Sequence, residues 1–112
     1  MTIKHFNKLV RNNIPEKIKE KGETVWAQPV IPEILPVLLK AKFNEEVSEL
    51  ADAHFTSEIR EELVDLLTVL KTYALFCNIN WDGLQNREIA KTKELGDFSQ
   101  GVFLFSTSKK DE

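Results

Sequence analysis

The sequence of 112 residues contains one cysteine, four glycines and four prolines, and it has no long apolar run. The single cysteine, Cys77, excludes a disulfide within the chain and a zinc site built from several cysteines. The small share of glycine and proline excludes a collagen-like chain and is atypical of a disordered one. No stretch approaches the roughly 18 consecutive apolar residues that a membrane-spanning helix needs.

An excess of basic residues is also missing, because the formal net charge is −3. This charge argues against a broad surface that follows the phosphates of a nucleic acid. The opening segment, MTIKHFNKLVRNN, lacks the apolar centre of a secretory signal. We therefore expect a cytoplasmic protein whose partners are neither nucleic acids nor membranes.

The composition that remains is that of a globular protein, with 42% hydrophobic and 29% charged residues. A chain of this length predicts a single domain over residues 1–112. Within it, residues 108–112 are expected to form a loose charged tail.

The pattern of apolar residues, caps and helix stops predicts a mainly α fold. Four helices are expected over about residues 15–21, 32 or 34–54, 58–77 and 81–95. Ser57 is the predicted cap of the third helix, with Glu61 as its support, and Gly22 and Gly96 end the first and fourth. Residues 24–30 and 102–106 predict one short β element. The expected fold is a helical hairpin or bundle of four to five helices.

The second helix carries a glutamate where an apolar residue is expected. At 100° per residue, Glu46 falls about 20° from the centre of the apolar arc, and Glu49 falls at its edge. The residues that form this arc are Leu35, Leu39, Phe43, Leu50 and Ala53.

The third helix is apolar around most of its circumference. Glu62 lies among its apolar residues, and Asp65 lies one step further round. A helix of this kind is usually buried on more than one side, so we expect a homodimer or a dimer of dimers. Its main stripe consists of Leu63, Leu66, Leu67, Leu70, Ala74 and Cys77, and Val64, Val69, Tyr73, Leu75 and Phe76 widen it.

Two pairs of acidic residues with i, i+3 spacing therefore lie on consecutive helices. Glu46 with Glu49 and Glu62 with Asp65 would converge if the two helices form an antiparallel hairpin. Four carboxylates so close together would repel one another unless a hard divalent cation, above all Mg²⁺, lies between them. The alternative is a solvated acidic face, because helices rich in glutamate are common.

The acidic pattern resembles the signature of the MazG-like, all-α nucleoside triphosphate pyrophosphohydrolases, a superfamily that also includes phosphoribosyl-ATP pyrophosphohydrolase. Its residues here are Glu45-Glu46-x-x-Glu49, followed after twelve residues by Glu62-x-x-Asp65. The run KLVRNNIP over residues 8–15 is similar to the start of a phosphoribosyl-ATP-pyrophosphohydrolase-like branch. The late stretch Arg87-x-x-x-Lys91-x-Lys93-x-x-Gly96-x-Phe98 is similar to the basic end of that branch.

This resemblance implies a Mg²⁺-dependent enzyme that cleaves between the α- and β-phosphates of a nucleoside triphosphate, giving a nucleoside monophosphate and pyrophosphate. Mn²⁺ is the alternative ion. Glu45 would be an outer partner of the metal or would position water. The residues implied as metal ligands are Glu46, Glu49, Glu62 and Asp65.

For the chemistry, Glu45 or Glu49 is the candidate general base. Basic side chains are expected to hold the outer phosphates; the candidates are Lys8, Arg11, Arg87, Lys91 and Lys93. One role for such an enzyme is the clearing of unwanted nucleoside triphosphates. Two alternatives stay open: hydrolysis of phosphoribosyl-ATP, and a non-catalytic helical module for dimerisation or interaction.

Overall fold

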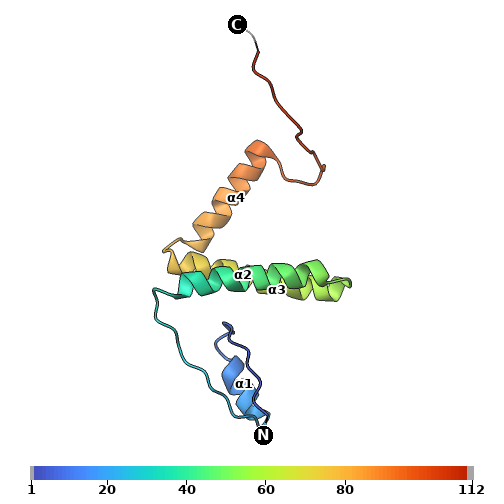
Figure 1. Cartoon of the computed structure of the whole chain (residues 1–112). Helices are drawn as coiled ribbons and strands as arrows, with labels where there is room; N and C mark the ends of the chain where they lie inside the picture. The colour runs from blue at the N-terminus through green and yellow to red at the C-terminus, as the bar shows by residue number, and fades with distance from the viewer. Residues whose placement is uncertain (1, 111–112) are drawn as a thin grey trace. The chain divides into compact units, whose positions relative to one another are not determined.

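The computed structural model describes residues 2–110 and contains four helices over that range (Figure 1). The chain divides into two compact units, Met1–Ile79 and Asn80–Glu112. The first unit holds α1 (Ile14–Glu20), α2 (Leu35–Asp52) and α3 (Thr56–Phe76), and the second holds α4 (Trp81–Leu95). The prediction of a mainly α fold is confirmed.

The central feature of the first unit is the hairpin of α2 and α3, which pack side by side (Figure 1). Residues 53–55 join the two helices in an extended turn, in which Ala53 has ψ 132° and Phe55 has ψ 147°. Because this link is short, α2 and α3 run antiparallel.

The predicted start of α3 is wrong by a short distance. Ser57 lies inside the helix, and the residue before the helix is Phe55, whose backbone N–H donates to Glu58 Oε1 at 3.3 Å. Glu58, and not Glu61, therefore supports the first turn. The physical reason is that a glutamate in the third helical position can satisfy a free N–H without help from a capping hydroxyl.

The hairpin buries few side chains. Among the described residues, the buried apolar ones are Leu39, Val69 and Ala74, and the buried charged one is Glu46. The predicted apolar stripe of α3 is largely uncovered within this chain: Leu63 is 52% exposed and Leu70 47%. Cys77, predicted in that stripe, is also exposed.

The predicted β element is not seen, because the structure assigns no strand to residues 24–30 or 102–106. Strand propensity is realised only where a partner strand supplies hydrogen bonds. Pro29 has no N–H to offer such a partner. Residues 102–105 are exposed by 75% or more, so their apolar character is not used for packing in the described structure.

The second unit contains the helix that sequence predicted most closely, α4, which has the expected bounds Trp81–Leu95. Asn80 Oδ1 accepts a hydrogen bond from the backbone N–H of Gly83 at 2.9 Å and so caps its start. Gly96, with φ +85°, ends it. Within residues 2–110, no helix combines the length and apolarity needed to cross a membrane. In the predicted tail, residues 108–110 are exposed, and residues 111 and 112 lie outside the described range.

Candidate metal centre

Five carboxylates from two helices gather on one side of the α2–α3 hairpin. One oxygen from each of Glu46, Glu62 and Asp65 lies within 4.8 Å of the others, and the same holds for a second group of Glu45, Glu46 and Glu49. Glu46 belongs to both groups and therefore joins them. We call these five residues the carboxylate cluster; all four predicted metal ligands are among its members.

Glu46 is the buried centre of the cluster, with 4% of the residue exposed. Its Oε1 lies 3.2 Å from Lys42 Nζ, while its Oε2 is buried without a hydrogen-bond partner. Glu62 Oε2 on the facing helix is likewise buried and unpartnered. Buried polar atoms are normally satisfied, so two such oxygens on neighbouring helices fit a site that would hold a proton or a cation.

The ionisation of Glu46 and Glu62 differs although both are glutamates. Burial raises the pKa of Glu46, but the neighbouring carboxyl group of Glu62 and the ammonium group of Lys42 outweigh it, so its pKa lies below the usual value. The close approach of Glu46, together with burial and the charges of Glu49 and Glu46, raises the pKa of Glu62 to about 7. Without a cation, Glu62 therefore keeps its proton to a higher pH than Glu46 does.

Glu49 has a different position at the edge of the cluster. Burial and the negative charge of Glu46 raise its pKa above the usual value of a glutamate. The side chain is nevertheless exposed, so solvent reaches it. A carboxylate that is both more basic than usual and accessible to water has two properties that a general base needs.

Lys42 is a cation at the cluster that the sequence reasoning missed. Its Nζ lies 3.2 Å from Glu46 Oε1 and 3.3 Å from Glu45 Oε2. Burial lowers the pKa of Lys42, but both carboxylates raise it further, so the net shift is upward and the ammonium stays charged. Lys42 precedes Glu45 by three residues and Glu46 by four, and this helical spacing could have predicted both contacts from the sequence.

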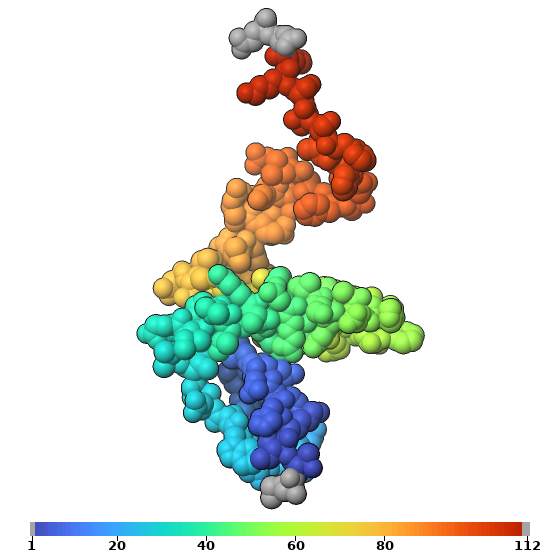
Figure 2. All heavy atoms as spheres, viewed as in Figure 1, coloured from blue at the N-terminus to red at the C-terminus, as the bar shows by residue number. Residues whose placement is uncertain are grey.

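The N-terminal segment brings two further cations to the cluster. Lys8 Nζ lies 3.5 Å from Glu45 Oε1, and Arg11 Nη2 lies 2.7 Å from Asp65 Oδ1. Arg11 Nη2 also donates to Thr68 Oγ1 at 3.1 Å, a contact for which the sequence held no signal. Figure 2 shows this segment, in blue, against the green hairpin. Arg11 thus contacts a predicted metal ligand, and Lys8 contacts Glu45, the predicted outer partner of the metal.

The other three predicted phosphate-binding residues lie on α4, in the second unit. Arg87, Lys91 and Lys93 are all exposed there. Their contribution to phosphate binding stays a prediction.

No family model, curated protein or solved structure matches this chain in the comparisons made.

Proposed function

We propose that this protein is a Mg²⁺-dependent nucleoside triphosphate pyrophosphohydrolase of the MazG-like type. It would cleave between the α- and β-phosphates and release a nucleoside monophosphate and pyrophosphate. The observation that carries the proposal is the buried Glu46, whose unpartnered Oε2 lies in a cluster with carboxylates of the facing helix. The resemblance of the acidic motifs supports the same reaction.

The cluster has the donor set that a hard divalent cation prefers. Carboxylate oxygens are the usual protein ligands of Mg²⁺ and Mn²⁺, and here two of them are buried without donors. In this proposal the metal ligands are Glu46, Glu49, Glu62 and Asp65. When bound, Mg²⁺ would supply charge neutralisation on the triphosphate and a lower pKa for a water molecule.

The chain's own residues have separate tasks in this proposal. Glu49 is the favoured general base over Glu45, because its pKa is raised and its side chain is exposed, whereas Glu45 is paired with Lys8 and Lys42. Lys8 and Arg11 would bind the outer phosphates, since both cations already lie at the cluster. Arg87, Lys91 and Lys93 would add positive charge from α4.

The proposal extends to the location, the oligomeric state and the role of the enzyme. The enzyme would act in the cytoplasm as a homodimer or dimer of dimers, and it would clear unwanted nucleoside triphosphates. The burial of Glu46 away from bulk water is consistent with such hydrolysis, because electrostatic effects of a metal are larger where water is excluded.

The test is pyrophosphate release from a panel of nucleoside triphosphates and phosphoribosyl-ATP, with and without Mg²⁺. We expect Mg²⁺-dependent release from nucleoside triphosphates. Glu62→Gln should abolish this release, while the neighbouring Glu61→Gln, an exposed change outside the cluster, should keep it. Release from phosphoribosyl-ATP alone would instead favour that substrate. If no substrate is cleaved and Mg²⁺ does not bind, a non-catalytic module becomes the better reading.

A further inference from the structure

Phe6 is an exposed aromatic residue beside the cations of the N-terminal segment. It is 59% exposed, and two ammonium groups lie over its ring: Lys4 Nζ at 5.1 Å and Lys8 Nζ at 5.8 Å from the ring centroid. Lys4, Phe6 and Lys8 alternate along a stretch without helix, and side chains two residues apart in an extended chain lie on the same side. The ring is therefore open to solvent and flanked by positive charge.

Lys8 links this ring to the carboxylate cluster. Its Nζ, which lies over the Phe6 ring, also lies 3.5 Å from Glu45 Oε1 on α2. Arg11, further along the same segment, lies 2.7 Å from Asp65 Oδ1 on α3. The segment thus leads from an exposed ring to two cations at the cluster. A nucleotide has a matching order of chemical groups, with a flat aromatic base at one end and anionic phosphates beyond the sugar.

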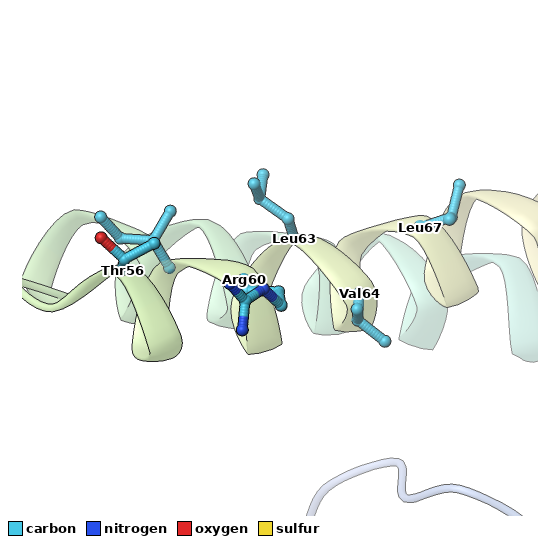
Figure 3. A pocket seen from close by; sticks show the side chains of 6 residues that line it. Thr56, Arg60, Leu63, Val64 and Leu67 are labelled. Atoms are coloured by element: carbon cyan, nitrogen blue, oxygen red, sulfur yellow. The ribbon is translucent and has the colours of Figure 1, made fainter.

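Two pockets along the hairpin are alternative places for a base, and neither has an aromatic residue in the lining that the structure describes. The second pocket borders the cluster at Glu49 and Glu62, but most of its lining is acidic and would repel phosphates. The first is the groove on α3 in Figure 3, and none of its residues belongs to the cluster. These residues are Thr56, Ile59, Arg60, Leu63, Val64 and Leu67.

We infer that the Phe6 ring stacks on the base of a nucleoside triphosphate whose phosphates lie at Lys8, Arg11 and the carboxylate cluster. The inference rests on the proposed function and adds the residue that binds the base. Contacts between an ammonium group and a ring are weak at exposed sites, so a base can replace a lysine on the ring. The displaced ammonium then has the phosphates as its new anionic partner.

The phenylalanine ring also limits what can be recognised. It has no hydrogen-bond donor or acceptor, so Phe6 cannot distinguish bases by the polar groups on their edges. Every base has a π-face, and stacking on an aromatic side chain therefore tolerates different bases. Phe6 accordingly selects nucleotides over ligands that consist of phosphates alone, and it accepts both purine and pyrimidine nucleoside triphosphates.

Isothermal calorimetry of the full chain with Mg²⁺ tests the inference. The ligands are the α,β-methylene analogues of ATP and CTP, in which a carbon replaces the oxygen of the scissile link, and inorganic tripolyphosphate, which has no base. Wild-type protein should bind both analogues more tightly than tripolyphosphate. Phe6→Ala should weaken the binding of both analogues roughly 5- to 150-fold, as expected for the loss of one base–aromatic stack, and leave tripolyphosphate binding unchanged.

Two further variants separate stacking from a structural role. Phe6→Trp keeps an aromatic face and should retain the affinity for the analogues. Phe55→Ala removes another exposed ring, that of a residue 72% exposed in the turn between α2 and α3, and should leave all three affinities unchanged. Circular dichroism should show the same helix content in every variant, because both rings are exposed.

Several results would overturn the inference. An equal loss of analogue and tripolyphosphate binding in Phe6→Ala would mean that the ring only positions the cations. Unchanged analogue binding in Phe6→Ala, or a loss in Phe55→Ala instead, would place the base elsewhere. Wild-type protein that binds none of the ligands would overturn the inference and the proposed function together. Binding of the analogues that depends on Phe6, without cleavage of any nucleoside triphosphate, would support the inference and remove only the proposed reaction.

Discussion

Arg11 Nη2 and Asp65 Oδ1 lie 2.7 Å apart, although 54 residues separate them in the chain. This ion pair places a cation of the N-terminal segment on a carboxylate that the proposed function gives to a metal. Arg11 and a divalent ion would thus compete for Asp65 until a substrate phosphate offers Arg11 another anion. Metal binding and phosphate binding are therefore expected to be coupled at this residue.

Arg11→Gln should raise the affinity for Mg²⁺ and weaken the affinity for substrate. Loss of a charged hydrogen bond to phosphate, about 1.5–3 kcal/mol, corresponds to roughly a 10- to 100-fold rise in KM. Thermal stability should change little, because the ion pair is half-exposed and such pairs contribute at most about 1 kcal/mol. Calorimetric Mg²⁺ titration and steady-state kinetics measure the two effects; weaker Mg²⁺ binding in the variant would contradict the competition.

Glu46→Gln should abolish Mg²⁺ binding while leaving the hairpin folded. The amide keeps the size of the side chain and can donate to Glu62, so the buried site loses a charge without gaining an unsatisfied group. Circular dichroism should show unchanged helix content, and isothermal calorimetry should show no Mg²⁺ signal. Unaltered Mg²⁺ binding in this variant would remove Glu46 from the metal site.

The stability of the metal-free protein should fall as the pH rises from about 4.5 to about 7. The pKa of Glu62 is raised to about 7 in the folded protein, so the folded state holds a proton that the unfolded chain releases above its ordinary value of 4.5. The lowered pKa of Glu46 has the opposite effect on the stability, at lower pH. It stabilises the folded protein above about pH 4.5, and this contribution is lost as the pH falls below that value.

Urea denaturation at pH 5 and pH 8, with and without Mg²⁺, measures this dependence. Mg²⁺ should restore stability at pH 8 by binding the ionised cluster. Glu62→Gln should make the decrease between pH 5 and pH 8 smaller, and the raised pKa of Glu49 accounts for a remainder in the same direction. A wild-type midpoint that is the same at both pH values without metal would show that the pKa of Glu62 is not raised in the folded protein.

Lys42→Met should destabilise the metal-free protein by about 1–3 kcal/mol, because the buried Glu46 carboxylate loses its half-buried cationic partner. Lys40→Met is the control on the same helix, since Lys40 lies 5.9 Å from the Tyr73 ring centroid and is exposed. Lys40→Met should lower the free energy of unfolding by less than about 1 kcal/mol. Mg²⁺ should recover most of the loss in Lys42→Met, and thermal melts with and without Mg²⁺ give the comparison. Equal losses in the two variants would mean that Lys42 does not neutralise the cluster.

Local signals decided which predictions of the fold succeeded. The bounds of α4 follow from Asn80 at its start and Gly96 at its end, two features that act within a few residues. The burial of Glu46 follows from the helical period, because a residue in the middle of an apolar arc faces the partner helix. The contact of Lys42 with Glu46 is also local and could have been predicted from its i, i+4 spacing.

The prediction of a β element was wrong because strand formation is not local. It depends on a partner strand that composition cannot specify. The stripe of α3 is a similar case: its apolar residues were recognised, but Val69 and Ala74 are buried while Leu63 and Leu70 stay exposed in the chain. A sequence pattern marks a side chain as apolar without saying which surface will cover it.

The sequence by itself determined the helices and the glutamates that interrupt their apolar arcs, because helical period, caps and stops are set by neighbouring residues. Only the tertiary structure decided that Glu46 and Glu62 share a buried site and that Arg11 meets Asp65. These contacts join residues far apart in the chain, and their distances depend on how α2, α3 and the N-terminal segment pack, which no local pattern encodes.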